Sequence, residues 1–242
     1  MTRCLLICEG PCDELILSLF KNVFCTGRIE IKPSGSCCFD KKNLLQNVGD
    51  LVQRILSKEK GYSISDFDEI SFLFDSDGIY IDEQYITVNI NDKTTSYTTV
   101  SITCRNKRLL LCRNKTRIKN IESFLKDGNY PIFYISRNLE HGFDNNACMN
   151  KSDKAKQRFS LDLFRQYDKR NYDFIAKLIS MNKSASCDYE ESWQYLKNGF
   201  NSLSSCSNLI LFLLKHYDDL IPECQRIIDE LVPRDNITKS TL

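Results

Sequence analysis

The chain is poor in histidine and lacks the paired cysteines of zinc sites. His141 and His216 are its only histidines, and none of its 12 cysteines falls in a Cys-x-x-Cys pair. Structural zinc sites draw their ligands from such spacings, so the sequence argues against a zinc protein. Because the cysteines are scattered, we expect them to be reduced and to pack in the interior.

Long apolar runs and a signal peptide are also missing. No stretch reaches the roughly 18 apolar residues of a membrane span, and the opening residues MTRCLLICEG are too short and too soon acidic for a signal peptide. We therefore expect a cytoplasmic protein without a membrane partner. No Gly-x-x-x-x-Gly-Lys-Ser/Thr motif occurs, so an ATPase partner would be a separate polypeptide.

Charge of one sign is not in excess either. The 33 basic and 32 acidic residues leave a net charge of +1. Overall charge is therefore uninformative about nucleic acid, and only a local cluster of basic residues can point to such a partner.

Apolar strand patterns alternate with helical patterns over the first 78 residues. The expected strands are 3–8 (RCLLIC), 28–35 (RIEIKPSG) and 70–78 (ISFLFDSDG), and the expected helices are 11–24 and 42–58. This alternation predicts an α/β fold with a mostly parallel sheet and right-handed crossovers. In such sheets, ligands bind at the carboxyl ends of the strands.

The remainder of the chain divides into a β-rich part and a helical part. Segments 85–90 and 98–104 resemble a hairpin, 108–112 (RLLLC) extends the sheet, and 131–136 is a further buried strand. Helices are expected at 117–126, 154–168, 171–180, 189–198, 206–217 and 222–231. We expect an α/β catalytic domain at 1–148, with a β insertion at about 80–115, and a helical region at 149–242.

Three acidic residues follow the expected strands. Glu9 ends the first strand, and Asp75 and Asp77 end the third. On an extended chain residues i and i+2 point to the same side, so the two aspartates can face one site. Carboxylates this close need a cation, and hard oxygen ligands suit Mg²⁺ or Mn²⁺. A solvated turn after the strand is the alternative, because Asp, Ser and Gly are turn residues.

The segments LLICEG and FLFDSD, with the strand and helix order between them, resemble the Toprim domain. That family includes topoisomerases, bacterial primases and the overcoming-lysogenization-defect nucleases. The resemblance implies that Asp75 and Asp77 hold Mg²⁺, and that Glu9 acts as a ligand or as a general acid or base on a phosphodiester. The chain has neither the strand-passage domains of a topoisomerase nor a primase zinc domain, so it is most similar to a small stand-alone nuclease.

Two later segments extend this resemblance. Glu140 follows the strand at 131–136 and is a candidate catalytic residue, with a solvated loop acid as the alternative. For His141 we favour a structural role over a proton-carrying one. Residues 192–214 resemble the helical end of abortive-infection Toprim proteins, and six residues there are expected to face the interior: Trp193, Leu196, Leu203, Leu209, Phe212 and Leu213.

A basic cluster lies between residues 105 and 119, which include no acidic residue. Such a cluster can neutralise phosphates, although basic residues also protect ordinary sheet edges. The candidate nucleic-acid contacts are Arg105, Lys107, Arg108, Arg113, Lys115 and Arg117. No recognition helix is evident, so DNA and RNA both remain open as the substrate.

These patterns predict a Mg²⁺- or Mn²⁺-dependent nuclease acting on DNA or RNA. The resemblance further implies a role in anti-phage defence, with an ATPase or a second copy of the chain as partner. The alternative is a catalytically silent Toprim module that binds nucleic acid or acts as a sensor subunit of a defence complex. A response regulator would need a lysine after the strand at 131–136, and a haloacid-dehalogenase-like phosphatase would need its Asp-x-Asp on the first strand; neither is present.

Overall fold

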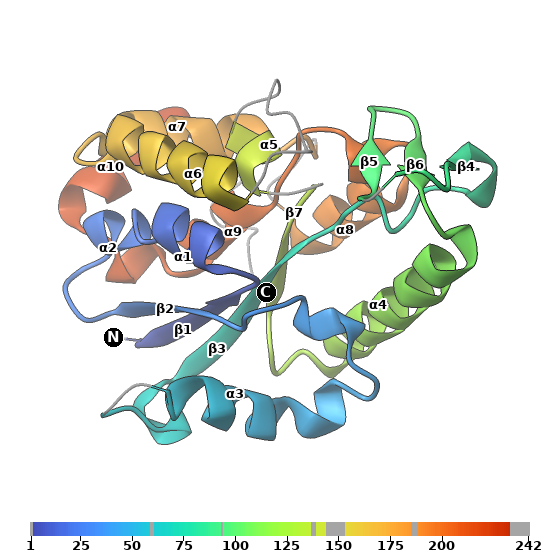
Figure 1. The fold of residues 1–242 in the computed structure, drawn as a ribbon. Helices are drawn as coiled ribbons and strands as arrows, with labels where there is room; N and C mark the ends of the chain where they lie inside the picture. Colours follow the sequence, from blue (N-terminus) through green and yellow to red (C-terminus); the bar gives the residue numbers. More distant parts are fainter. Residues whose placement is uncertain are drawn as a thin grey trace.

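A four-stranded parallel sheet forms the centre of the molecule (Figure 1). The computed structural model describes residues 2–58, 61–92, 94–136, 139–143, 153–184 and 188–232. The strands are β1 (Cys4–Cys8), β2 (Ile29–Pro33), β3 (Glu69–Asp75) and β7 (Ile132–Ile135), in the order β2-β1-β3-β7. All three strand pairs are parallel. The predicted α/β class, with a parallel sheet flanked by helices, is confirmed.

Helices cover both faces of this sheet, as Figure 1 shows. On one side of the sheet a single hydrophobic cluster includes residues of α1 (Pro11–Leu17), α2 (Phe20–Val23), α5 (Leu139–Phe143), α6 (Asp153–Tyr167), α7 (Asn171–Met181), α9 (Leu209–Lys215) and α10 (Pro222–Leu231). The other face packs against α3 (Val48–Leu56), α4 (Lys107–Asp127) and α8 (Tyr189–Lys197). Successive strand side chains point to opposite faces, so Leu6 joins the first hydrophobic cluster while Leu5 and Ile7 join the second.

The C-terminal helices contribute to both of these clusters. Phe212 of α9 packs edge-on against Phe133 of β7, and Trp193 of α8 stacks on Phe74 of β3 with ring centroids 5.9 Å apart. The six residues predicted to face the interior in this region are all at most 2% exposed, which confirms that prediction. The sequence position at which the helical region begins is therefore not a division of the hydrophobic core.

A second, small sheet lies beyond the carboxyl end of β3. Its strands are β4 (Ile86–Val88), β5 (Ser96–Tyr97) and β6 (Ile102–Cys104), in the order β4-β6-β5. The predicted hairpin between 85–90 and 98–104 is wrong, because β4 and β6 pair in parallel and β5 supplies the antiparallel partner of β6. β5 lies between the two predicted strands in the sequence and takes the antiparallel position beside β6.

The predicted strand at 108–112 is also wrong, because these residues belong to the long helix α4. The Asn106 side chain caps the helix by accepting from the Leu109 N–H at 3.0 Å, and Gly128 ends it with φ +73°. Leu109 is 68% exposed, so the apolar run is not a buried strand. A four-residue apolar run is compatible with either element, and here the cap and the helical residues after it decide.

Two other helices are shorter than predicted. The expected helix at 11–24 is interrupted between α1 and α2, and α3 begins only at Val48, after a 3-10 turn at Leu45–Asn47. Within the described ranges no helix combines the length and the hydropathy that a membrane crossing requires.

Candidate active site

Glu9 and Asp75 meet at the carboxyl edge of the parallel sheet. Glu9 directly follows β1, and Asp75 is the last residue of β3. Because β1 and β3 are adjacent and parallel, their ends lie side by side. The backbone N–H of Asp75 donates a hydrogen bond to Glu9 Oε1 at 3.2 Å. The structure thus brings together two acidic residues that lie 66 positions apart in the chain.

Asp77 joins them from a tight turn rather than from an extended strand. Asp77 and Gly78 both have positive φ, +48° and +67°, and the Ile79 N–H donates to the Ser76 carbonyl oxygen at 2.9 Å. Two central residues with positive φ are the mark of a type I′ turn, for which Asp-Gly is a preferred pair. Asp75 and Asp77 therefore do not share one side of an extended chain, contrary to the sequence prediction. A turn is present, as in the alternative, but it is not a solvated one, because Ser76 and Gly78 are buried.

Gly78 is required at this turn. A Cβ atom on Gly78 would lie 2.5 Å from Leu203 Cδ2 and 3.0 Å from Ile102 Cδ1. The Ser76 hydroxyl also donates to the Ser202 carbonyl oxygen, at 3.1 Å. The turn that presents Asp77 is thus clamped by a 3-10 turn, Asn201–Leu203, and by β6.

A buried arginine, Arg117 of α4, neutralises part of this acidic cluster. Arg117 Nη1 donates to Asp77 Oδ2 at 3.0 Å, and Nε and Nη2 both donate to the Asp40 carboxylate. The Arg117 side chain is only 3% exposed. Asp40 closes the loop that follows β2, and Asn120 of α4 donates to the carbonyl oxygens of Phe39 and Lys41 on either side of it.

We call Glu9, Asp40, Asp75, Asp77 and Arg117 the acid cluster. Asp40 and the pairing of Arg117 were missed by the sequence reasoning. Asp40 could have been suspected from its place after a parallel strand. Nothing in the sequence marks Arg117 as its partner, because the two residues meet only through the packing of α4 on the loop.

The pKa of Glu9 is raised, first by burial and then by neighbouring negative charge. Burial raises the pKa of Glu9, and the nearby charge of Asp77 raises it further. Arg117 and hydrogen bonds from the Cys37 thiol and the Asp75 N–H oppose this rise without cancelling it. A raised pKa makes a carboxyl group a stronger proton acceptor than an ordinary glutamate, which suits a general acid or base.

The donor set of the acid cluster fits a hard divalent cation in its chemistry. Two carboxylates, Asp40 and Asp77, pair with the single Arg117 guanidinium, and the Glu9 carboxyl group feels the charge of Asp77, so the ionised cluster retains negative charge that Mg²⁺ or Mn²⁺ would offset. Over the described ranges, however, no three His, Cys, Asp or Glu side chains are grouped closely enough to hold a metal ion as they stand. Metal binding by Glu9, Asp75 and Asp77 would therefore require side-chain movement.

Glu140 and His141 follow β7, and neither is shown to join the acid cluster. Glu140 falls within α5, but its side chain lies outside the described part of the structure. His141 is buried, 3% exposed, beside residues that pack against β7. His216 is likewise buried, at the opposite end of the sheet, where its Nε2 lies 3.1 Å from Glu69 Oε1. Neither histidine faces solvent.

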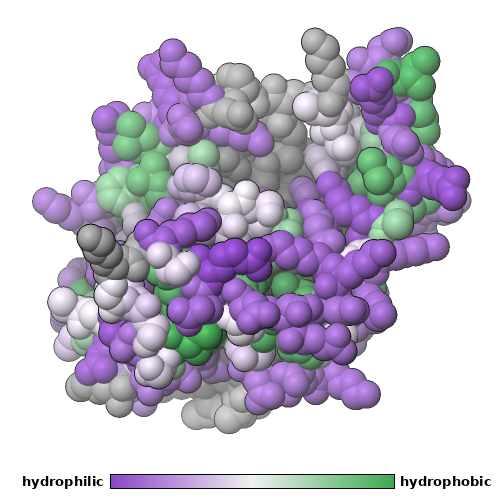
Figure 2. Space-filling model, turned by 60° about the horizontal axis from the view of Figure 1, so that its bottom comes forward, coloured by the Kyte–Doolittle hydropathy of each residue, from purple (hydrophilic) through white to green (hydrophobic). Residues whose placement is uncertain are grey.

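The predicted basic cluster lies on and just before α4. Arg105, Arg108 and Lys115 are exposed, while Lys107 is half-buried and lies 3.5 Å from Glu83. Figure 2 shows that hydrophilic residues predominate on the side of the molecule that carries α3 and α4. Arg117 is not part of this surface, because it is buried in the acid cluster, and Arg113 is half-buried.

No protein-family model, no curated protein and no solved structure matches this chain. The resemblance to Toprim proteins therefore stays a prediction from the sequence, and function has to be argued from the acid cluster itself.

Proposed function

We propose that the chain is a metal-dependent nuclease that hydrolyses phosphodiester bonds of DNA or RNA. One observation carries the proposal: acidic residues following β1, β2 and β3 meet at the sheet edge where parallel α/β folds bind their ligands. Glu9, Asp75 and Asp77 would hold Mg²⁺ or Mn²⁺, which supplies polarisation of the phosphoryl oxygens and activation of a water.

The chain's own residues supply the rest of the chemistry. Glu9, with its raised pKa, can hold or release a proton at its carboxyl oxygen. Arg117 holds Asp40 and Asp77 in place and adds a positive charge beside the reacting phosphate. The exposed basic residues of α4 would neutralise neighbouring phosphates of the strand. An anti-phage role, and an ATPase or homo-oligomeric partner, extend this proposal on the ground of the resemblance alone.

The second candidate is a catalytically silent module that binds nucleic acid or serves as a sensor subunit. Its specific support is the Arg117–Asp77 ion pair, in which the guanidinium already satisfies one of the expected metal ligands. In this case the buried arginine would take the structural place of the metal ion.

Calorimetry combined with a cleavage assay separates the two candidates. Mg²⁺ and Mn²⁺ would be titrated into the wild type, Asp75→Asn, Glu9→Gln and the control Asp50→Asn, which removes an exposed carboxylate on α3. Plasmid DNA and total tRNA would be incubated with the same samples. For the nuclease we expect Asp75→Asn to lose metal binding. Glu9→Gln should cleave at least about 100-fold more slowly than wild type. Asp50→Asn should behave like wild type in both assays.

Other outcomes have a defined meaning. Metal binding without cleavage by the wild type would favour the silent module. Undiminished cleavage by both Asp75→Asn and Glu9→Gln would overturn the mechanism.

A further inference from the structure

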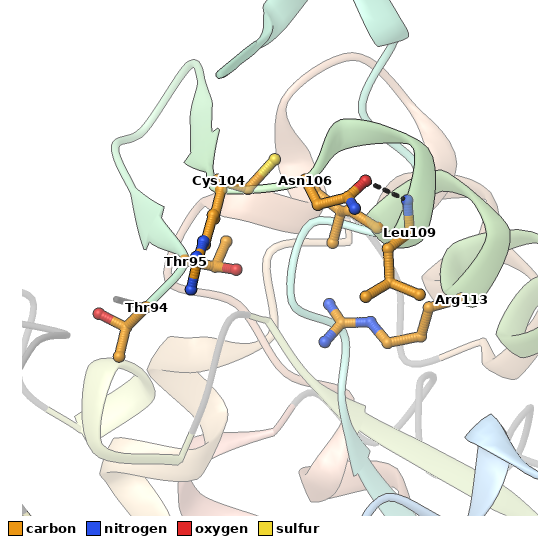
Figure 3. Close-up of a pocket in the computed structure, with 8 residues that line it drawn as sticks. Thr94, Thr95, Cys104, Asn106, Leu109 and Arg113 are labelled. Atoms are coloured by element: carbon orange, nitrogen blue, oxygen red, sulfur yellow. Dashed lines mark hydrogen bonds between the residues drawn. The ribbon is translucent and has the colours of Figure 1, made fainter. Parts of the chain in front are cut away.

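A small cavity lies between the second sheet and the first turns of α4. Its volume is about 240 Å³. Figure 3 shows the Arg113 side chain and Thr95 approaching it from opposite sides. Two hydroxyl residues, Thr94 and Thr95, and two cations, Arg105 and Arg113, line it beside the apolar Leu109. No acidic residue is among the described residues that form its walls.

The Arg113 guanidinium has unused hydrogen-bonding capacity. Its Nε and Nη2 are buried and have no hydrogen-bond partner in the part of the chain that the structure describes. A buried N–H group left without an acceptor destabilises the folded protein, and more so when it is charged. Two neighbouring N–H groups of a guanidinium match two oxygens of one phosphate or carboxylate. An oxyanion is the class of ligand that would supply two such acceptors.

The size and charge of the cavity favour a compact anion with a charge near −2. Pockets that enclose drug-sized ligands measure about 300–1,000 Å³, so this cavity takes one compact group rather than a whole nucleotide. Arg105 and Arg113 together match the charge of a phosphomonoester, which approaches −2 near neutral pH. A phosphodiester carries only one charge and would continue as a chain on both sides.

The cavity adjoins the acid cluster through Tyr97 of β5. The Tyr97 hydroxyl hydrogen-bonds with Arg113, and burial followed by the charge of Asp77 raises the pKa of Tyr97. Tyr97 is thus close to a residue of each site. Arg113 and Arg117 are four positions apart on α4 and lie on the same side of the helix. The same face of α4 therefore supplies Arg117 to the acid cluster and Arg113 to the cavity.

We infer that this cavity binds a phosphomonoester, the terminal phosphate of a nucleic-acid strand whose following phosphodiester reaches the acid cluster. The identity of the strand rests on the proposed function, whereas phosphate binding by the cavity does not. The site would make the enzyme prefer phosphorylated ends over hydroxyl ends or unbroken strands.

Binding of short oligonucleotides tests this inference without any cleavage. Fluorescence anisotropy in EDTA would compare three otherwise identical strands, with a 5′-phosphate, with a 3′-phosphate, and with hydroxyl groups at both ends. Inorganic phosphate would serve as competitor. The proteins are the wild type, Arg113→Gln, the rim variant Arg105→Gln, and Lys119→Gln, which removes an exposed charge from the same helix. Thermal unfolding of each variant verifies its folding.

We expect wild type to bind one phosphorylated end at least about tenfold more tightly than the hydroxyl strand, a difference of ~1.4 kcal/mol. Arg113→Gln should remove this preference, Arg105→Gln should reduce it, and Lys119→Gln should weaken all strands equally. Equal binding of phosphorylated and hydroxyl strands by wild type, or an unchanged preference in folded Arg113→Gln and Arg105→Gln, would overturn the inference.

These binding data, taken with the cleavage assay described above, separate this inference from the nuclease proposal. A phosphate preference in a protein that never cleaves with Mg²⁺ would retain the cavity assignment and reject the nuclease. Metal-dependent cleavage without any phosphate preference would retain the nuclease proposal and reject the cavity assignment.

Discussion

At the scale of single residues, Arg117 determines how the acid cluster is held together. Its guanidinium makes charge-assisted hydrogen bonds to two carboxylates from different loops, and its side chain is buried. Burial alone would lower the pKa of Arg117, but the hydrogen bonds to Asp40 and the charge of Asp77 outweigh it and raise that pKa. Removing one partner of a buried ion pair leaves an uncompensated buried charge, which is destabilising. Arg117, Asp40 and Asp77 therefore depend on one another.

Replacing Arg117 by methionine should destabilise the protein by about 3–5 kcal/mol, because Asp40 and Asp77 lose their counter-charge. If Mg²⁺ binds these carboxylates, it should raise the melting temperature of Arg117→Met more than that of wild type, since the ion replaces the missing charge. Thermal unfolding with and without Mg²⁺ measures both effects. Arg54→Met, at an exposed position of α3, is the control. Equal Mg²⁺ shifts in wild type and Arg117→Met would contradict the metal site.

Glu69 forms a second, half-buried ion pair at the opposite end of the sheet. Its carboxylate lies 3.0 Å from Lys215 Nζ and 3.1 Å from His216 Nε2. Burial alone would raise the pKa of Glu69, but the hydrogen bond and charge of His216, with those of Lys215, outweigh it and lower the pKa to about 2. This contribution to stability is complete above the unfolded pKa of about 4.3 and is lost as the pH falls toward 2.

The variant Glu69→Gln should therefore unfold more easily than wild type by about 1–3 kcal/mol at pH 7. The difference should shrink by about half or more at pH 3, because Glu69 then contributes less to the wild type. Urea unfolding at several pH values between 3 and 7 measures this change. Glu190→Gln, an exposed change on α8, should show neither effect. A difference that stays constant over this range would contradict the low pKa of Glu69.

At the scale of the elements, the parallel strands were predictable and the connections were not. The runs at β1, β3 and β7 are continuously apolar because these strands are buried on both faces, and such runs are visible in sequence. The positions of Glu9 and Asp75 follow from them. The pairing of β4, β5 and β6 and the packing of α4 on Asp40 depend on contacts between distant segments, for which local patterns hold no information.

In the turn Ser76–Ile79, replacing Gly78 should cost stability both through backbone strain and through a steric clash, and a second glycine allows the two costs to be measured separately. We expect Gly78→Ala to destabilise the protein by more than Gly27→Ala. Both glycines have positive φ, +67° and +77°, so both changes incur the left-handed cost of about 1–2 kcal/mol. Only at Gly78 does the new Cβ also meet Leu203 and Ile102, whereas nothing lies within 4 Å at Gly27. Denaturant unfolding of the two variants measures the difference. Equal costs would mean that the clamp on the turn is loose.

At the scale of the whole molecule, the helical C-terminal region and the α/β part share their hydrophobic clusters. Phe133 and Phe74 of the central sheet pack against Phe212 and Trp193 from the later part of the chain. Tyr189 of α8 also donates its hydroxyl to the Ile132 carbonyl oxygen, at 2.6 Å, and accepts from the Ile132 N–H. Each part would expose a large apolar area if separated from the other.

A fragment ending at residue 148 should therefore not fold on its own. Circular dichroism should show no cooperative melting for this fragment, whereas the whole chain should melt in a single transition. Co-expression with a fragment of residues 149–242 should restore a folded complex, because the shared clusters reform. A cooperative transition in fragment 1–148 alone would show that the two parts are independent domains.

The strand β7 would be an open edge of the sheet were it not for a segment from late in the chain. Ser207 forms an antiparallel bridge with Ile135, the Ser136 N–H donates to Cys206, and Asn208 accepts from the Tyr134 N–H. These contacts occupy backbone groups that could otherwise pair with a strand of another molecule. The opposite edge strand, β2, carries Glu30, Lys32 and Pro33, which disfavour such pairing. The molecule thus protects its central sheet from intermolecular β-association at both edges.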